Sequence, residues 1–336
     1  MAYSALKDLQ CRSDLFPNPV QMMQNVCVGY VDFGLNKAEW DHKVKRVNHI
    51  FELIGRTPMV RINKMNPNPN VDMYAKLEGF NPMGSLKDRI ALRMIEKAEE
   101  EGKLTKDKII LEATSGNTGI SVAWVATLKG YRCIIILPKS ISNERKKILR
   151  VLGAKLVFVS TEAEAIKKAR EIAKNTQYFM TDQFANEMNW KAHYQTTGEE
   201  IWEQTEGRIT HFVAGIGTSG TIMGVARKLR EFKKGIQIIG VQPSRPSSRQ
   251  QGLLNLHDFY PEIYKCDELD EILMVEDEDA FKAARDLLLK EGLFVGISSG
   301  SAMWGAIQKA KEINQGLIVT IFGDHGFKYL STNLFG

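Results

Sequence analysis

Lys87 is the residue of this sequence whose position most clearly suggests chemistry. It follows a turn signal that ends at Gly84, and residues 89–98 then place apolar side chains about one helical turn apart. Ser85 or Asp88 is suited to cap the helix that begins here. An amine anchored at such a turn, once burial lowers its pKa, can accept a proton near neutral pH. A lone lysine is more often a surface residue, so the interpretation of Lys87 depends on the loops downstream.

Three of those loops are rich in Gly, Ser and Thr, and each lies between a predicted strand and a predicted helix. In open α/β sheets, ligands bind at this position. The first loop, residues 114–119, offers backbone N–H groups and hydroxyls at a helix start, which suits a carboxylate. Its Asn117 adds an amide donor that can stabilise a phenolate-like oxygen. The alternative interpretation is that this loop simply caps the helix that follows.

The other two loops are suited to a phosphate and to a ring nitrogen. Residues 215–221 form a glycine-rich turn with three hydroxyls at a helix start, which favours a phosphate monoester. Their spacing matches neither a P-loop nor the GxGxxG dinucleotide pattern. In the third loop, residues 296–301, a buried serine hydroxyl can donate to a neutral ring nitrogen, or it merely caps the next helix.

The elements that position these loops alternate between short apolar strands and amphipathic helices. This alternation occurs in two series along the chain, which predicts an α/β protein with two domains, each a twisted, mostly parallel sheet flanked by helices. Single helices are expected over 193–206 and 279–290, among others. The longest irregular stretch is expected over 242–269.

Composition limits the partners and the location of the protein. Of its 336 residues, 43% are hydrophobic and 25% are charged, which is ordinary for a soluble globular chain. The net charge is +5, without a basic tract of the nucleic-acid-binding type. No apolar run approaches the ~20 residues of a membrane span, and the N-terminus lacks the apolar core of a signal peptide. Four scattered cysteines without a CxxC pair indicate a reducing compartment. We therefore expect a cytoplasmic protein with no nucleic-acid or membrane partner.

Residues 1–50 are the least informative part of the sequence. They contain Cys11, Cys27, His42 and His49, so a metal or haem site is conceivable. Their spacings match no established ligand pattern. We interpret this segment as an N-terminal arm that packs on the body or on a partner subunit, and we expect no metal.

An amine, a phosphate cradle, a donor to a ring nitrogen and a donor to a phenolate-like oxygen are together what pyridoxal phosphate requires. The chain resembles the fold type II pyridoxal phosphate enzymes, specifically the cysteine synthase and cystathionine β-synthase family. The resemblance runs from about residue 51 to the end, and it is carried by residues 85–89, 114–119, 182–184, 196–202, 217–221 and 296–300. Features of the B-type cysteine synthases, the O-acetylserine or O-phosphoserine sulfhydrylases, occur at residues 112–115, 207–213 and 329–336.

This resemblance implies a role for each matched residue. Lys87 would form the Schiff base with pyridoxal phosphate and remove the α proton of the substrate. Asn117 would bind the 3′ oxygen of the cofactor, and Ser298 would meet its ring nitrogen. The phosphate would be held by Gly217, Thr218, Ser219, Gly220 and Thr221, and the substrate carboxylate by Thr114, Ser115, Thr118 and Gln183.

The resemblance also implies how the domains are divided. A smaller domain is expected over 81–191, with the loop that holds the substrate carboxylate being mobile. A larger domain would combine 51–80 with 192–336, and the cofactor would bind between the two. A homodimer is expected.

The implied reaction is a β-replacement that makes L-cysteine from an activated serine. Loss of the β substituent leaves an α-aminoacrylate, which sulfide or a related sulfur donor then attacks. A serine at the ring nitrogen leaves the ring a weaker electron sink, which favours this elimination. Ile90 and Thr118 occupy positions where serine and threonine dehydratases carry Gly and His, so replacement is favoured over dehydration. The alternatives are condensation of serine with homocysteine or another nucleophile, as in cystathionine β-synthase, and a non-catalytic regulatory homologue.

The donor is left open between O-acetylserine, O-phosphoserine and serine. Arg245, or else Arg249, could bind a donor phosphate with two hydrogen bonds. Relatives that use O-phosphoserine carry an arginine one position earlier, and Arg245 is otherwise a solvated arginine on a mobile loop. Asp324, His325 and Lys328 lie at another predicted strand end and are interpreted as the rim or outer layer of the site.

Overall fold

The computed structural model describes residues 46–114, 116–246 and 248–335. Residues 47–336 form one compact unit, and the following description concerns the described residues of that unit.

Most of the predicted N-terminal arm, with Cys11, Cys27 and His42, lies outside the described residues. His49 is described, and its Nδ1 accepts a hydrogen bond of 3.2 Å from the backbone N–H of Phe51. It thereby caps the short 3-10 helix η1 (Ile50–Leu53). In the part of the chain that the structure describes, no group of three His, Cys, Asp or Glu side chains could hold a metal ion.

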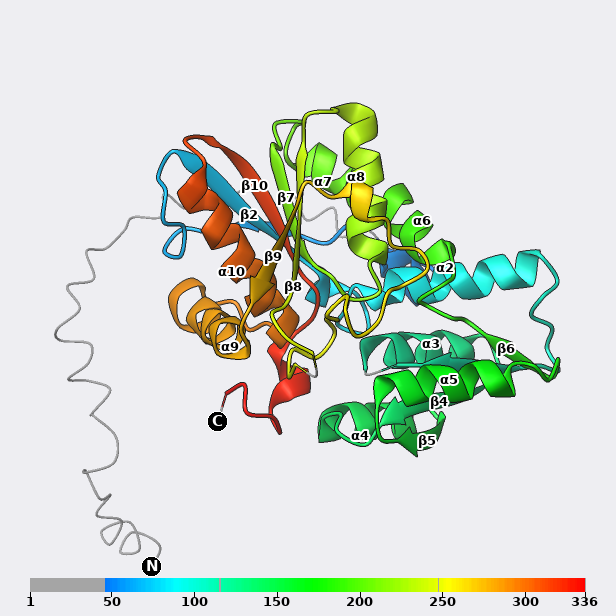
Figure 1. Ribbon diagram of the computed structural model, residues 1–336. Helices are drawn as coiled ribbons and strands as arrows, with labels where there is room; N and C mark the ends of the chain where they lie inside the picture. Colours follow the sequence, from blue (N-terminus) through cyan, green and yellow to red (C-terminus); the bar gives the residue numbers. More distant parts are fainter. Residues whose placement is uncertain (1–45, 115, 247, 336) are drawn as a thin grey trace, which may run out of the picture. The chain divides into compact units, whose positions relative to one another are not determined.

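Two sheets form the framework of the molecule (Figure 1). The larger sheet has the strand order β1 (Met59–Arg61), β2 (Val71–Leu77), β10 (Gly316–Phe322), β7 (His211–Gly215), β8 (Gln237–Pro243) and β9 (Glu271–Val275). The smaller sheet has the order β5 (Lys155–Val159), β4 (Arg132–Pro138), β3 (Ile109–Ala113) and β6 (Tyr178–Met180). β1 is antiparallel to β2, and every other pair of these strands is parallel.

The helices connect the strands and cover the sheets. They are α2 (Lys87–Glu100), α3 (Asn117–Leu128), α4 (Asn143–Val151), α5 (Glu162–Ile172), α6 (Met188–Gln195), α7 (Thr197–Gln204), α8 (Gly220–Phe232), α9 (Asp277–Asp286) and α10 (Ile297–Glu312). Short helical turns are η2 (Glu78–Phe80), η3 (Cys266–Glu268), the π turn η4 (Leu287–Glu291) and η5 (Gly326–Tyr329). In the described ranges, none of these helices combines the length and apolar content that a membrane span requires.

Alternating side chains bury both faces of each sheet, as parallel sheets require. On β7, Val213 belongs to a core shared with α9 and α10, whereas its neighbours Phe212 and Ala214 belong to a core shared with α8. On β3, Ile110 packs in a core with α2 and α3, and the next residue, Leu111, packs in a core with α5. Figure 1 shows α9 and α10 beside the larger sheet and α3, α4 and α5 around the smaller one.

The prediction of mostly parallel sheets flanked by helices is confirmed. All strands of the smaller sheet fall within residues 81–191, and those of the larger sheet fall outside that range. The domain boundaries themselves, 81–191 against 51–80 with 192–336, stay a prediction.

Three elements differ from the prediction. The helix expected over 193–206 is two helices, α6 and α7, because the backbone leaves helical geometry at Thr196, with φ −128° and ψ −71°. The helix expected over 279–290 begins earlier and ends in the π turn η4. Strand β9 was not predicted, because it is an edge strand whose side chains are mostly half-exposed and show no clear alternation.

Candidate active site

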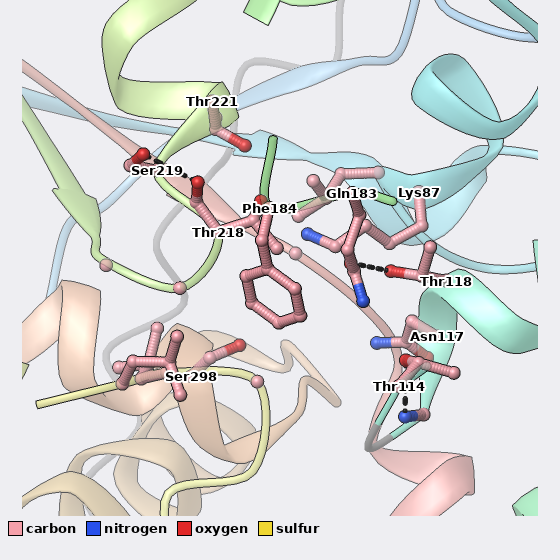
Figure 2. A pocket seen from close by; sticks show the side chains of 18 of the residues that line it. Lys87, Thr114, Asn117, Thr118, Gln183, Phe184, Thr218, Ser219, Thr221 and Ser298 are labelled. Atoms are coloured by element: carbon pink, nitrogen blue, oxygen red, sulfur yellow. Dashed lines mark hydrogen bonds between the residues drawn. The ribbon is translucent and has the colours of Figure 1, made fainter. Parts of the chain in front are cut away.

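One pocket brings together loops that follow strands of both sheets. Thr114 follows β3, Gln183 follows β6, and Gly217 follows β7. Because parallel strands present their carboxyl ends at one edge of a sheet, these loops can converge on a single ligand. The predicted site residues that line the pocket are Lys87, Thr114, Asn117, Thr118, Gln183, Gly217, Thr218, Ser219, Thr221 and Ser298 (Figure 2). Gly220 belongs to the same loop as Gly217, and Ser115 lies outside the described residues.

Lys87 is the first residue of α2 and is held by a tightly bonded turn. The backbone N–H of Lys87 donates to Ser85 Oγ at 3.3 Å, and the N–H of Leu86 donates to the carbonyl of Gly323 at 3.0 Å. Asp88 does not cap the helix as predicted. Its Oδ2 accepts from the backbone N–H of Met83 at 2.7 Å, so the carboxylate braces the turn before Lys87.

The environment of Lys87 shifts the amine towards its neutral form. Burial disfavours the charged form and lowers the pKa of Lys87 to about 8, although the carboxylates of Asp324 and Glu78 act in the opposite direction. An ordinary lysine has a pKa of 10.5, at which little neutral amine exists near neutral pH. The lowered value makes Lys87 suited to act as a base or to condense with an aldehyde.

The loop 217–221 starts helix α8 and is packed too closely for side chains at its glycines. A Cβ at Gly217 would lie 2.3 Å from the carbonyl oxygen of Gly252, and a Cβ at Gly220 would lie 1.8 Å from Asn189 Oδ1. Ser219 has the left-handed φ of 67°. The first N–H groups of a helix have no partner within it, so this loop directs backbone donors into the pocket.

Two buried side chains hold two of the three hydroxyls of this loop. Asn189 Nδ2 donates to Thr218 Oγ1 at 2.9 Å, and Thr221 Oγ1 lies 3.2 Å from His193 Nε2. Burial, followed by the charges of Arg89 and Lys87, lowers the pKa of His193 to about 3, so its ring is neutral. Backbone donors, hydroxyls and a helix N-terminus are a donor set that fits a phosphate monoester. Together with an amine of low pKa, they fit pyridoxal phosphate.

Hydrogen bonds at the loop 114–119 fix side chains that are predicted to bind the substrate carboxylate. The N–H of Gly116 donates to Thr114 Oγ1 at 3.0 Å. Thr118 Oγ1 donates to Gln183 Oε1 at 2.5 Å, and Gln183 Nε2 donates to the carbonyl of Ala113 at 3.0 Å. Thr114, Thr118 and Gln183 are therefore fixed next to the start of α3.

Asn117 and Ser298 come from different elements. Asn117 starts α3, and its amide is bonded at both ends: Nδ2 donates to Asp324 Oδ2 at 2.7 Å, and Oδ1 accepts from Lys328 Nζ at 3.0 Å. Ser298 lies in the first turn of α10. It thus begins a helix rather than lying in a loop, and it still lines the pocket.

Arg245 is the predicted site residue that the structure places elsewhere. It is not among the residues that line the pocket. Its guanidinium pairs with Glu276 at 3.1 Å, and its side chain is 64% exposed. This placement matches the alternative of a solvated arginine, and it gives no support to a role in binding a donor phosphate.

Several residues near the site were missed by sequence reasoning. Arg145, from α4, lines the pocket, and its guanidinium donates to Tyr329 Oη at 2.7 Å and to Gln251. Phe184 and Leu253 form apolar parts of the lining. Phe184 is adjacent to Gln183 in a matched motif, which was a usable signal. No local signal in the sequence marks Arg145 or Leu253.

Comparison with known proteins identifies relatives over most of the chain. The family described as "Pyridoxal-phosphate dependent enzyme" matches residues 50–324. A cysteine synthase of Aquifex aeolicus (strain VF5) is 46% identical over 300 residues, which cover 85% of this chain and 91% of the relative. Cysteine synthase B of Escherichia coli (strain K12) is 44% identical and covers 85% of this chain and 95% of its own length.

A solved structure agrees with these relatives. The cysteine synthase of Entamoeba histolytica superposes with a TM-score of 0.82 and 37% sequence identity, covering 87% of this chain and 91% of that one. The fold, the pocket and the sequence relationship agree, and the chain belongs to the family of pyridoxal-phosphate dependent enzymes.

Proposed function

We propose that this protein is a cysteine synthase that replaces the β-acetoxy group of O-acetylserine with sulfide and releases acetate. The observation that carries the proposal is the convergence of three groups on one pocket: the Lys87 amine, the start of α8 and the Thr118–Gln183 pair. Each suits one requirement of the reaction, namely a base, a cofactor phosphate site and a carboxylate site. The relatives described above are named cysteine synthases, which supports the same reaction.

Pyridoxal phosphate, when bound, supplies a ring that accepts electrons from the α carbon of the amino acid. In this proposal, residues 217–221 hold its phosphate, Asn117 donates to its 3′ oxygen, and Ser298 donates to its ring nitrogen. Lys87 binds it and then serves as the base. Because burial keeps the pKa of Lys87 near 8, its neutral amine can remove the α proton of the donor.

The amino-acid substrate is oriented by its carboxylate. Thr114, Ser115, Thr118 and Gln183 are proposed to bind it at the start of α3. A carboxylate held there by several donors leaves the α carbon little rotational freedom, which favours proton transfer to Lys87.

The charges of the pocket favour a donor whose β substituent is uncharged. Among the described lining residues, the cations are Lys87 and Arg145. Arg145 Nη2 lies 3.6 Å from Asp324 Oδ2, so its charge is compensated by a buried carboxylate. The charged phosphate ester of O-phosphoserine would need a cation to balance it, whereas the uncharged acetyl ester of O-acetylserine would not.

The test offers one donor at a time to the holoenzyme with sulfide and measures cysteine. We expect O-acetylserine to react at least about tenfold faster than O-phosphoserine, since one unpaired charge in a pocket costs more than about 1.4 kcal/mol. Serine should also react more slowly, because hydroxide is a poorer leaving group than acetate. Turnover only with serine and homocysteine would show the alternative, a cystathionine β-synthase-type enzyme. Absence of turnover with every donor would favour a non-catalytic homologue.

Assembly and location are part of this proposal. We propose a homodimer in the cytoplasm. Phe80 and Phe327 are 62% and 63% exposed, and apolar exposure of this kind is typical of a surface that a second subunit covers. Cys133 and Cys266 are free thiols, which suits a reducing compartment. Sedimentation equilibrium of the holoenzyme should give twice the monomer mass, and a monomer would contradict the dimer.

A further inference from the structure

Lys328 lies outside the pocket lining but makes three hydrogen bonds to groups that shape it. Its ammonium group, Nζ, donates to the carbonyls of Met83 at 2.9 Å and Gly84 at 3.1 Å, and to Asn117 Oδ1 at 3.0 Å. Lys328 is only 6% exposed. An ammonium group has three donors, and the three acceptors account for all of them.

This arrangement joins two parts of the site that are far apart in the sequence. Met83 and Gly84 belong to the turn that precedes Lys87, and Asn117 starts helix α3. Lys328 belongs to η5, after the last strand of the larger sheet. One buried cation therefore connects the turn that carries the amine with the loop that is proposed to bind the cofactor ring and the substrate.

The chemistry of the partners fixes the orientation of the Asn117 amide. An ammonium group can only donate, so it must face the amide oxygen of Asn117. The carboxylate of Asp324 can only accept, and it receives the Nδ2 hydrogen at 2.7 Å. Rotating the amide by half a turn would place its NH2 group against the ammonium and its oxygen against the carboxylate. Both contacts would be repulsive, so the charges of Lys328 and Asp324 select one orientation.

The position of this cation has a cost that a purely structural role does not explain. Burial lowers the pKa of Lys328 to about 8, despite the Asp324 carboxylate. Its three acceptors are neutral oxygens rather than carboxylates, so the desolvated charge has little compensation from direct partners. The benefit of the charge lies in the direction that it imposes on Asn117.

We propose that Lys328 is a positioning residue that orients the Asn117 amide, so that Nδ2 keeps its second hydrogen for the anionic oxygen of the cofactor ring. This inference rests on the role of Asn117 in the proposed function. It predicts that the charge of Lys328, rather than its bulk, determines how strongly Asn117 contributes to cofactor binding.

The test measures the dissociation constant of pyridoxal phosphate from cofactor-free protein by titration of the visible absorbance of bound cofactor. Lys328→Met keeps the length of the side chain and removes the donors, and it should weaken binding roughly tenfold. Lys328→Arg keeps a donor-only cation and should bind within about threefold of the parent protein. Lys228→Met is the matched control, because Lys228, on α8, is also 6% exposed but pairs with Glu199 of α7 and Glu231 of α8. It should leave cofactor affinity unchanged.

A double-mutant cycle separates orientation from general damage. Asn117→Ala should weaken binding in the parent protein but add little in the Lys328→Met background, because the misoriented amide no longer contributes. Parent-like affinity of Lys328→Met, or an equal loss from Asn117→Ala in both backgrounds, would overturn the proposal. If Lys328→Met does not fold cooperatively, Lys328→Leu, which also lacks donors, replaces it in the same cycle, with the same two outcomes deciding. Failure of the parent protein to make cysteine would instead contradict the proposed function and leave this binding comparison intact.

Discussion

The hydroxyl of Thr118 donates a 2.5 Å hydrogen bond to Oε1 of Gln183 and joins the start of α3 to the segment after β6. Both side chains are buried and both line the pocket. Because the Gln183 amide is also bonded to the Ala113 carbonyl at 3.0 Å, it is held in one orientation before any substrate arrives.

This pair predicts a specific loss of substrate affinity. Gln183→Ala should raise the KM for O-acetylserine by roughly 10- to 100-fold, because an oriented donor to a charged carboxylate contributes about 1.5–3 kcal/mol. Cofactor affinity should stay within about twofold, since the Gln183 side chain bonds to Thr118 and Ala113 and not to the described side chains of residues 217–221. Steady-state kinetics and a cofactor titration measure the two effects. An unchanged KM would remove Gln183 from the proposed carboxylate site.

The close packing of residues 217–221, which are proposed to hold the cofactor phosphate, predicts a loss of cofactor affinity rather than of substrate affinity. In Gly217→Ala the new methyl group would lie 2.3 Å from the carbonyl oxygen of Gly252, so the loop or its neighbour must move. Overpacking of this kind typically costs about 1–3 kcal/mol, and we expect cofactor affinity to fall about tenfold or more. Gly235→Ala is the matched control, because nothing lies within 4 Å of its Cβ position. Equal affinities in the two variants would show that residues 217–221 do not hold the phosphate.

Arg89, two residues after Lys87, is the centre of a buried ion network. Its Nε donates to Glu78 at 2.7 Å, its Nη1 donates to Glu200 at 2.6 Å, and it is 4% exposed. Burial alone would raise the pKa of Glu78, but the Arg89 guanidinium lowers it to about 2. Arg89→Met leaves a buried carboxylate unpaired and should lower the free energy of unfolding by about 3–5 kcal/mol.

A surface pair provides the comparison for Arg89. Arg61 pairs with Asp72 at 2.8 Å, but its side chain is 54% exposed. Arg61→Met should therefore change the free energy of unfolding by less than about 1 kcal/mol. Urea denaturation of both variants measures the difference. Similar losses would mean that burial does not determine the contribution of these pairs.

Glu112 predicts a pH dependence of stability. It is fully buried in β3, and burial raises its pKa from 4.5 to about 8. Between these values the folded state keeps a proton that the unfolded state releases, so the Glu112 contribution to stability falls as pH rises from about 4.5 to about 8. At pH 7 the loss is roughly 3 kcal/mol.

A neutral side chain at position 112 should remove the loss of stability that accompanies rising pH. Glu112→Gln should gain stability over the parent protein as pH rises from 5 to 8, in urea denaturation at several pH values. Glu100→Gln is the control, because Glu100 is exposed. A constant difference between Glu112→Gln and the parent protein across this range would contradict a protonated Glu112.

The parts of the fold that could be predicted from the sequence are those with a local signal. Short apolar strands such as 133–137 and the Gly-rich starts of helices can each be recognised from about ten consecutive residues of the sequence. Six separate stretches matched one family in order, so the pocket residues could be proposed before their distances were known. Thr118 and Gln183 were assigned to one task in this way, and the structure brings them into contact.

What could not be predicted depends on contacts between distant segments. The sequence carries no information that Lys328 reaches Asn117 or that Arg145 reaches Tyr329, because 211 and 184 residues separate these partners. The sequence also does not show which way a loop turns. Arg245 was therefore a candidate for binding the donor, although its side chain pairs with Glu276. The break at Thr196 was missed because both flanking segments have helical patterns.

Borohydride reduction of the holoenzyme followed by peptide mass spectrometry tests most directly whether Lys87 is the lysine that binds pyridoxal phosphate. A pyridoxal phosphate bound through the proposed amine becomes permanently attached to the lysine that holds it. We expect a single labelled peptide carrying the phosphopyridoxyl group on Lys87, and none in Lys87→Ala. Labelling of another buried lysine such as Lys76 or Lys328, or no labelling in the parent protein, would contradict it.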